Sequence, residues 1–411
     1  MLALLRKNRD FRAVFAAQVI SYMGDWFASV AMLGLVLDLT HSDLAATLVF
    51  VSQTLPAFLM TPLAGPTADR FDRRAVMVTV SVVQIGAALL FLAVGHHTVW
   101  LAFLAQGSIS ALSAFFQPAS QAALPNLVEP EDLATATVMM SATWGAMLAI
   151  GAALGGLFTV LFGRTASFLA DAASFAVAAA LITSVRRRMG GLGREERGRS
   201  RMRPLADTAE ALRYARRHPA LLALLGSKMG FGLSGGVVGL LAVFATKKFH
   251  AGDAGTGVLL AARGAGVVLG PLLARRIADR GVDGIILACG LAGVVYGAGY
   301  AIVPLAPLLA LAAIAVFAAH LGGGAQWTLS TYGLQVSTPD ELRGRIFASD
   351  FALVTLTLTV SFVAAGALST QFGPGPVTFG LAGISALWGV AYLTLTRAVR
   401  ADAIALGAPV D

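Results

Sequence analysis

The chain has 411 residues, of which 57% are hydrophobic and 13% charged, with a mean hydropathy of +0.77 and a net charge of +8. Soluble domains carry roughly 25% charged residues, so this composition excludes a soluble globular protein and predicts a membrane protein. The single cysteine, Cys289, excludes an internal disulfide and a cysteine-based metal site.

Twelve apolar segments follow one another along the chain, and each is long enough to cross a bilayer as a helix of about 20 residues. Backbone polar groups must be paired inside hydrocarbon, which predicts helices throughout. We therefore expect an all-α membrane protein with twelve transmembrane helices. The segments run near 11–37, 44–68, 75–95, 98–122, 132–161, 165–185, 219–246, 254–278, 284–304, 307–335, 341–371 and 376–397.

Lysine and arginine residues are concentrated on one predicted side of the membrane. The termini, alternate loops and the central stretch hold 25 of them, whereas only Arg164, Lys247 and Lys248 fall on the other side. Because cytoplasmic loops carry the positive excess, we expect a multi-pass protein of the bacterial inner membrane with both termini in the cytoplasm. Nucleic-acid binding is not expected. The apolar run after Arg12 is too long for a cleavable signal peptide, so none is expected.

Two landmarks recur at an offset of about half the chain. Asp69 is repeated as Asp279, 210 positions later, and the Pro-Glu-Asp-Leu sequence at 130–133 is repeated as Pro-Asp-Glu-Leu at 339–342. Two similar membrane halves are typical of secondary transporters. We therefore expect six-helix bundles over 1–185 and 219–411, joined by a cytoplasmic linker over 186–218.

The predicted linker ends in a segment with helical amphipathic spacing. Residues 205–217 place leucines and alanines on one face with arginines between them. This pattern fits a short helix on the inner membrane surface, which would bind anionic lipid. The alternative is a tether that only joins the two halves.

The first span carries an acidic residue near its middle. Asp25 lies fourteen residues into that span, which is ~20 Å along a helix. A charge at mid-bilayer costs roughly 2.5–3.5 kcal/mol on insertion scales, so it requires a reason. Because a carboxyl group in an apolar site can exchange protons near neutral pH, we expect Asp25 to couple protons or to bind substrate. The alternative is a structural hydrogen bond or an ion pair, for example with Arg263.

The loop after the second span reads Gly-Pro-Thr-Ala-Asp-Arg-Phe-Asp-Arg-Arg over 65–74. It resembles the G-x-x-x-D-R-x-G-R-R signature between the second and third helices of the major facilitator superfamily, with Asp72 in place of the usual glycine. Together with twelve spans, a central linker and the half-chain repeat, the resemblance covers the whole chain. It implies the major facilitator fold, in which two pseudo-symmetric six-helix halves face each other.

The resemblance also implies a cytoplasmic gate. In the superfamily the loop aspartate docks at the start of the eleventh helix, where the partial positive charge of a helix N-terminus attracts a carboxylate. Asp69 would then latch the two halves together. The alternative is that the loop arginines only set the topology. The candidate gate residues are Gly65, Asp69, Arg70, Arg73, Arg74, Asp279, Arg280, Arg343 and Arg345.

Further stretches indicate a branch of the superfamily. Gly151, Gly155 and Gly156 in the fifth span resemble the G-P-x-x-G-G motif of drug:proton antiporters, with alanine in place of proline. These glycines would allow close packing near the interface of the halves, or are ordinary small-residue packing. Phe103 replaces the arginine of the antiporter R-x-x-Q-G motif. The proton-relay mechanism of those antiporters therefore cannot be carried over in full to this chain. The stretches 21–26 in the first span, 116–128 before the fifth, 168–175 in the sixth and 338–345 before the eleventh resemble the branch with macrolide-efflux pumps, siderophore exporters and a lysophospholipid transporter.

Five other ionisable residues lie inside spans. Lys228 and Asp350 each lie nine residues from a cytoplasmic end, so their equal depth allows a salt bridge, which we interpret as structural. Arg263 would bind an anionic group or hold Asp25. Asp171 lies in a helix that is peripheral in this fold, and we interpret it as structural. His320 titrates near neutral pH, but we interpret it as a packing residue.

Aromatic, methionine and glutamine side chains at cavity-prone positions predict an adaptable pocket. The candidates are Gln18, Tyr22, Trp26, Phe115, Gln117, Met140, Trp144, Met147, Gln326, Trp327 and Tyr332.

Together these features favour proton-coupled efflux of hydrophobic or amphipathic small molecules, of multidrug or macrolide type. The halves would rock around a central site to give alternating access. The alternative is a lysophospholipid or siderophore transporter of the same fold. An enzyme or receptor is not expected, because metal clusters, nucleotide loops and nucleophile–base motifs are missing from the sequence. We expect no cofactor and no metal, and a monomer whose partners are substrate, protons and membrane lipids.

Overall fold

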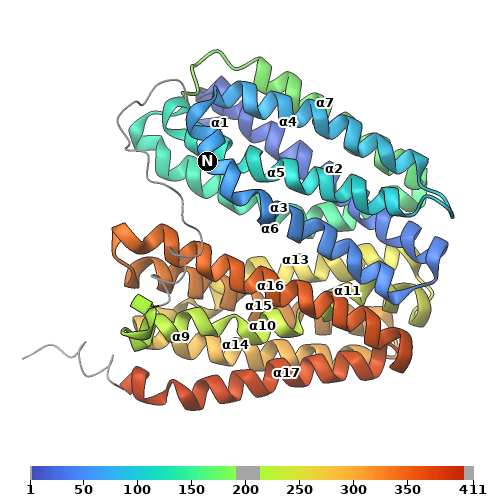
Figure 1. The fold of residues 1–411 in the computed structure, drawn as a ribbon, viewed down its shortest axis with the longest axis vertical. Coiled ribbons are helices and arrows are strands. Elements are labelled where there is room, and N and C mark those ends of the chain that lie inside the picture. The colour runs from blue at the N-terminus through green and yellow to red at the C-terminus, as the bar shows by residue number, and fades with distance from the viewer. Residues whose placement is uncertain (1, 191–212, 402–411) are drawn as a thin grey trace, which may run out of the picture. The chain divides into compact units, whose positions relative to one another are not determined.

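The computed structural model describes residues 2–190 and 213–401, where the regular secondary structure is helical (Figure 1). The chain divides into two compact units, of which the first comprises residues 1–198 and 242–261 and the second comprises 199–241 and 262–411. Most of the predicted amphipathic segment 205–217 lies outside the described residues. The predicted bundle boundaries at 185 and 219 stay a prediction.

The first unit is built from long helices that pack in a defined order. Helix α2 packs against α6 and α7, α3 packs against α5, and α4 packs against α5 and α7. Part of the later chain, from residue 242 to 261, also belongs to this unit. The helices are α1 (Leu2–Lys7), α2 (Arg9–Thr40), α3 (Asp43–Arg70), α4 (Arg73–Leu89), α5 (Trp100–Leu127), α6 (Leu133–Phe162) and α7 (Arg164–Thr183), with 3₁₀ turns at Leu90–Ala93 and Pro130–Asp132.

The second unit repeats part of this packing order. Helix α14 packs against α15 and α17, as α4 packs against α5 and α7 in the first unit. The similarity supports the repeat that the sequence predicts. The helices from this part of the chain are α9 (Pro219–Ser227), α10 (Met229–Ser234), α11 (Gly236–Gly239), α12 (Leu241–Val243), α13 (Gly252–Ala278), α14 (Val282–Ile302), α15 (Leu309–Ser337), α16 (Asp340–Phe372) and α17 (Pro374–Leu395), with a π-helical turn at Phe244–Lys248 and a 3₁₀ turn at Val303–Leu305.

Eleven helical segments of the described chain are long and apolar enough to cross a membrane, which confirms the predicted all-helical membrane fold. The remaining predicted span corresponds to α5, which has 28 residues and contains no charged side chain. It is long enough to cross a bilayer. Its hydropathy is lowered by polar residues that include Gln106 and Gln117.

The seventh predicted span is broken rather than continuous. Four short helices and a π-helical turn cover Pro219–Lys248. Glycines occupy positions where a side chain would strike α16, since a Cβ on Gly232 would lie 2.0 Å from Thr357 Oγ1 and one on Gly236 would lie 2.3 Å from the Ser361 carbonyl oxygen. Ser361 Oγ accepts a hydrogen bond from Gly236 N and donates one to the Leu233 carbonyl. A side chain thus pairs backbone groups that the break releases, as the hydrocarbon region requires.

The loop between α3 and α4 explains the departure from the superfamily signature. Asp72 caps α4, because its carboxylate accepts a hydrogen bond from Ala75 N at 2.8 Å. Arg73 donates to the carbonyls of Ala68, Ala122 and Met189. This arginine therefore ties the end of α3 to α5 and to the chain that follows α7.

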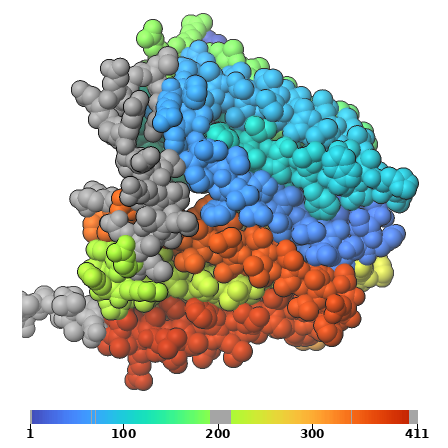
Figure 2. Space-filling view, viewed as in Figure 1, coloured from blue at the N-terminus to red at the C-terminus, as the bar shows by residue number. Residues whose placement is uncertain are grey.

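Each unit has its own apolar core. In the first unit the core gathers around Phe11, Met77 and Leu127, and in the second around Leu224, Ile286 and Cys289. The space-filling view shows that side chains fill the spaces between neighbouring ribbons within each unit (Figure 2). One cavity of the first unit lies at the predicted acidic residue.

Candidate functional site

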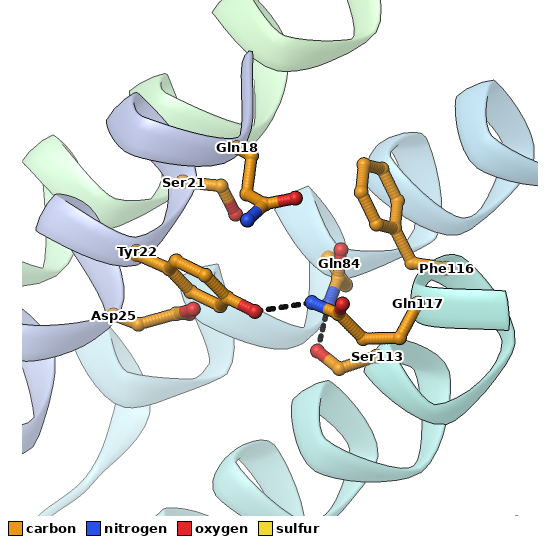
Figure 3. Close-up of a pocket in the computed structure, with 8 residues that line it drawn as sticks. All are labelled: Gln18, Ser21, Tyr22, Asp25, Gln84, Ser113, Phe116 and Gln117. Atoms are coloured by element: carbon orange, nitrogen blue, oxygen red, sulfur yellow. Dashed lines mark hydrogen bonds between the residues drawn. The ribbon is translucent and has the colours of Figure 1, made fainter. Parts of the chain in front are cut away.

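Asp25 lines a polar cavity within the first unit. Helix α2 contributes Gln18, Ser21, Tyr22 and Asp25, and the other lining residues are Gln84 of α4 and Ser113, Phe116 and Gln117 of α5 (Figure 3). Gln18, Tyr22 and Gln117 are among the predicted cavity residues. The spacing of Gln18, Tyr22 and Asp25 places them on one face of α2, since residues three and four apart are neighbours on a helix.

Side-chain amides organise the wall of this cavity. The Gln117 amide donates to the Tyr22 hydroxyl, and the Gln84 amide donates to Ser113 Oγ at 2.9 Å (Figure 3). The Gln18 amide donates to the Met140 carbonyl at 3.0 Å. These bonds satisfy polar groups that would otherwise be costly in an apolar interior. The wall is thus held in place without using the carboxyl group of Asp25.

The carboxyl group of Asp25 makes no hydrogen bond and no ion pair with the other described residues of its unit. The cavity has a volume of about 20 Å³. A space of ~10–15 Å³ is enough for one water molecule, whereas an organic ligand needs several hundred. The cavity is therefore large enough for a water molecule beside Asp25 and too small for a large substrate.

Asp171 is the second acidic residue buried in this unit. Its side chain is fully buried in α7, and neither carboxyl oxygen has a hydrogen-bond partner among the described residues. It faces α2, because a Cβ on Gly24 would lie 2.9 Å from Asp171 Oδ1. Asp171 is thus next to the helix turn that carries Asp25, but it does not line the cavity.

The predicted antiporter-like glycines lie at close helix contacts. A Cβ on Gly151 would lie 3.0 Å from the Cβ of Trp26, and one on Gly155 would lie 3.1 Å from the Trp26 carbonyl. A Cβ on Gly156 would lie 3.0 Å from the Cα of Gly257 in α13. Small residues therefore let α6 approach both α2 and the first turns of α13. Trp26 packs against α6 at this contact.

The other predicted cavity residues are spread over several environments. Phe115 lines a separate apolar hollow between α3, α4 and α5, with a volume of about 290 Å³. Met140 and Met147 are buried, whereas Trp144 is exposed. In the second unit Gln326 is buried and donates to the Ser227 carbonyl, while Trp327 and Tyr332 are exposed.

Lys228 and Asp350 form a buried ion pair in the second unit. Lys228 Nζ lies 2.5 Å from Asp350 Oδ2 and 3.0 Å from Thr331 Oγ1. The side chains are only 2% and 8% exposed. Lys228 Nζ also lies 4.8 Å from the centre of the Trp327 ring. Lys228 caps the end of α9 at the break in this span, so the pair fixes that break against α15 and α16.

Arg263 of α13 and His320 of α15 belong to a second buried polar cluster in the same unit. His320 is 1% exposed and its Nε2 lies 2.9 Å from the hydroxyl oxygen of Tyr300. Arg263 has no ion pair among the described residues, and its Nε atom is buried without a partner.

The predicted gate residues are mostly found at helix ends. Arg70 and Arg280 are exposed, and Arg74 donates to the Arg187 carbonyl at 3.0 Å. Asp279, which follows the end of α13, lies 3.8 Å from Arg275 in the last turn of that helix. Arg343 donates to the Thr338 carbonyl, and Arg345 is half-buried. The surroundings of Gly65 and the side chain of Asp69 lie outside what the structure describes, so the latch stays a prediction.

A cluster of charges that the sequence reading missed lies at the other ends of the first-unit helices. Arg164 Nη1 lies 2.7 Å from Asp38, and its Nε lies 2.8 Å from Asp253. Lys247 lies 2.6 Å from Asp43. The available signal was the position of Asp38, Asp43 and Asp253 at span ends opposite the positive loops. These ion pairs hold the segment 242–261 within the first unit.

Comparison with known families gives a match along nearly the whole chain. The family model described as "Transmembrane secretion effector" matches residues 1–407. Among curated proteins, the chain is 25% identical over 221 residues to the uncharacterized MFS-type transporter YfiS of Bacillus subtilis (strain 168), covering 53% of this chain and 52% of that protein. It is 26% identical over 286 residues to the uncharacterized MFS-type transporter YkuC of the same organism, covering 66% of each. The matches thus span about half and about two thirds of these relatives.

Solved structures resemble the fold at low sequence identity. A POT family transporter in complex with 5-aminolevulinic acid gives a TM-score of 0.74 at 10% identity, covering 95% of this chain and 97% of that one. The nucleoside transporter NupG gives a TM-score of 0.71 at 14% identity, covering 94% and 99%. A bacterial homolog of the human lysosomal transporter Spinster gives 0.68 at 15% identity, covering 96% of each. These likenesses support the fold alone.

Proposed function

The chain belongs to the transmembrane secretion effector family of the major facilitator superfamily, and we propose that this secondary transporter exports hydrophobic or amphipathic small molecules in exchange for protons. The proposed transport is of multidrug or macrolide type, from the cytoplasm across a bacterial inner membrane. The fold is that of a multi-pass transporter. The single observation that carries the proton coupling is the unpaired carboxyl group of Asp25 beside a water-sized polar cavity.

The surroundings of Asp25 suit a carboxyl group that gains and loses a proton. A carboxylate without a cation or hydrogen-bond donors is costly in an apolar interior, while the neutral acid is tolerated. Water in the cavity would solvate the charged form and carry the proton. Each change in hydration of this cavity therefore changes which form of Asp25 is favoured.

This preference links the proton to alternating access. A proton shifts the equilibrium between inward-open and outward-open states only by its different affinity for the two. A state in which water reaches Asp25 stabilises the carboxylate, and a state in which the cavity closes stabilises the acid. Proton binding and release on opposite sides would therefore drive the cycle.

The close contacts of α6 support a transport cycle in which packed helices slide past one another and stay folded. Gly155 and Gly156 bring α6 close to the backbones of α2 and α13, and Gly151 packs against the Trp26 side chain. Smooth contacts between backbones allow small sliding movements, which are one known type of conformational change. In the proposed cycle α6 moves relative to α2 or α13 at these glycines.

Replacement of Asp25 by asparagine tests the proton coupling. Inside-out vesicles containing the protein would be incubated with a fluorescent hydrophobic dye such as Hoechst 33342 in the outer medium, with and without an imposed pH gradient. We expect gradient-driven dye movement in the parent and a rate equal to that of empty vesicles for Asp25→Asn. Asparagine has the same shape but cannot exchange a proton at neutral pH.

The matched control is Asp72→Asn, which makes the same carboxyl-to-amide change at the cap of α4. Asparagine caps a helix as well as aspartate does, so this variant should transport like the parent. Gradient-driven transport by Asp25→Asn at the parental rate would remove Asp25 from the coupling mechanism. Absence of any gradient dependence in the parent would refute proton coupling itself.

A further inference from the structure

A buried polar cluster in the second unit has more hydrogen-bonding groups than partners. It is formed by Arg263 of α13, Tyr296 and Tyr300 of α14 and His320 of α15. Tyr296 and Tyr300 are fully buried and His320 is 1% exposed, whereas Arg263 is half-buried. The cluster therefore lies inside the unit, with Arg263 at its accessible edge.

The hydrogen bonds of the cluster can be counted atom by atom. The Tyr300 hydroxyl pairs with His320 Nε2 at 2.9 Å. Three other polar atoms are buried without a partner among the described residues, namely Arg263 Nε, the Tyr296 hydroxyl oxygen and His320 Nδ1. Native structures leave few such groups, because a buried donor or acceptor without a partner is costly. Three in one cluster leave hydrogen-bonding capacity that a polar ligand can satisfy.

Close helix packing holds these groups together. A Cβ on Gly266 would lie 2.5 Å from the Phe317 carbonyl oxygen and 2.8 Å from the Cβ of His320, so α13 and α15 are nearly in backbone contact. Arg263 lies one helical turn from Gly266 and therefore on the same face of α13. The Tyr296 ring lies 5.2 Å from the His320 ring at a steep angle. The cluster is thus a rigid arrangement rather than a set of mobile side chains.

The charge of the cluster is not balanced within the described part of the unit. Arginine stays protonated under all ordinary conditions, and Arg263 has no carboxylate partner there. Lys228, a buried cation of the same unit, is neutralised by Asp350. An unpaired cation within a membrane-spanning helix is costly, and such residues commonly mark binding sites or pathways.

We propose that Arg263, Tyr296 and His320 bind an oxyanion group, a carboxylate, phosphate or sulfate carried by an amphipathic molecule. The guanidinium group binds such groups through paired N–H donors, and the Tyr296 hydroxyl adds a further donor. His320 Nδ1 donates a third hydrogen bond when Nε2 accepts from Tyr300. This inference deepens the proposed function, on which it rests, by giving the substrate class an anionic head and an apolar tail.

Binding can be measured with the purified full chain in a neutral maltoside detergent. The probes are dodecyl phosphate, its neutral counterpart dodecanol, and inorganic phosphate. Cys289 is the only cysteine and is 1% exposed in α14, so a fluorogenic maleimide reports thermal opening of the second unit. A ligand that binds only the folded state raises the midpoint of thermal unfolding, and the stabilisation grows with the logarithm of one plus its concentration over Kd.

We expect dodecyl phosphate to raise the midpoint and dodecanol to leave it unchanged. Arg263→Gln should weaken dodecyl phosphate binding by about tenfold or more, since hydrogen bonds to charged groups are among the stronger ones. Tyr296→Phe should weaken binding by a smaller factor. The matched control is Arg276→Gln, which removes the same charge from an exposed position on the same helix and should bind like the parent.

Two further measurements separate binding from structure. Without ligand, Arg263→Gln should unfold at the parental midpoint or above it, because an unpaired buried cation is removed; a purely structural arginine would give a lower midpoint. Asp25→Asn should bind dodecyl phosphate like the parent, so a failure of proton coupling would not be mistaken for a failure of this site.

The source of the anion is resolved by the other probes. Inorganic phosphate that binds as tightly as dodecyl phosphate would assign the site to a free anion. A midpoint that rises in nanodiscs containing phosphatidylglycerol, relative to phosphatidylcholine, and does so only with Arg263 present, would assign it to a lipid headgroup. Equal binding of dodecyl phosphate by the parent and Arg263→Gln, or of dodecanol and dodecyl phosphate by the parent, would overturn the proposal.

Discussion

Removal of Lys228 should reveal how strongly the buried ion pair of the second unit holds the chain together. The substitution Lys228→Met keeps an unbranched apolar stem of similar length. It removes the ammonium group that lies 2.5 Å from Asp350 Oδ2 and 3.0 Å from Thr331 Oγ1. Asp350 would then remain buried with neither carboxyl oxygen paired, since its Oδ1 already lacks a partner among the described residues.

The expected cost follows from the burial of the pair. Breaking one partner of a buried ion pair typically costs about 3–5 kcal/mol, because a charge is left uncompensated. The side chains of Lys228 and Asp350 are 2% and 8% exposed, so solvent screening is small. For a unit of this size, ~2–4 °C per kcal/mol gives a lowered midpoint on the order of 10 °C.

The measurement is thermal opening of the second unit, followed by maleimide labelling of Cys289. Cys289 lies in the same apolar core as Leu224, near the end of α9. The variant Cys289→Ser gives the labelling background. Single variants Lys228→Met and Asp350→Leu and the double variant form a cycle whose coupling energy isolates the pair.

The double variant shows whether the loss of stability comes from breaking the ion pair or from any substitution at these two positions. Replacing both members of a buried ion pair by apolar residues is often neutral or stabilising, so Lys228→Met with Asp350→Leu should recover most of the lost stability. A parental midpoint for Lys228→Met alone, or losses that simply add in the double variant, would refute this account of the pair.

Three further substitutions test the first unit by thermal unfolding followed through tryptophan fluorescence. Asp72→Ala should cost about 1 kcal/mol through loss of the α4 cap. Gly156→Ala should cost ~1–3 kcal/mol, because the added methyl group would lie 3.0 Å from the Cα of Gly257. Arg164→Gln should cost about 1–3 kcal/mol, since it leaves Asp253, which is 12% exposed, without its charged partner. A parental midpoint in any of these variants would show that the contact concerned adds no net stability.

The depth of a residue in the membrane is predicted well from the sequence, because the rise per residue of a helix fixes its position along the span. Lys228 and Asp350 were placed at equal depth in two spans, and the structure shows them in contact. The sequence also predicted the helical spans and the internal repeat. In agreement with the repeat, α14 packs against α15 and α17 as α4 packs against α5 and α7. The sequence predicted much less well the direction in which a side chain points.

Most site residues that the sequence did not predict were missed because the sequence does not fix how each helix is rotated about its axis, and so which neighbour a side chain faces. Gln84 and Ser113 face the Asp25 cavity, but single polar residues in apolar spans do not indicate which neighbour they meet. The break in Pro219–Lys248 depends on contacts with α16, although its many glycines were a usable signal. Tyr296 gave no signal beyond an aromatic residue in an apolar helix.

Asp171 provides the sharpest comparison for the proposed role of Asp25. Both are aspartates of the first unit, but Asp25 lines a cavity and Asp171 is sealed between α7 and α2. Because no cation or hydrogen-bond donor reaches the Asp171 oxygens among the described residues, a neutral group suits this position. Asp171→Asn should therefore keep both the unfolding midpoint and the gradient-driven dye transport of the parent, whereas Asp25→Asn keeps only the midpoint. Loss of coupling in both variants would show instead that the proton is shared between two carboxyl groups, and Asp171 would then have to exchange its proton through Asp25.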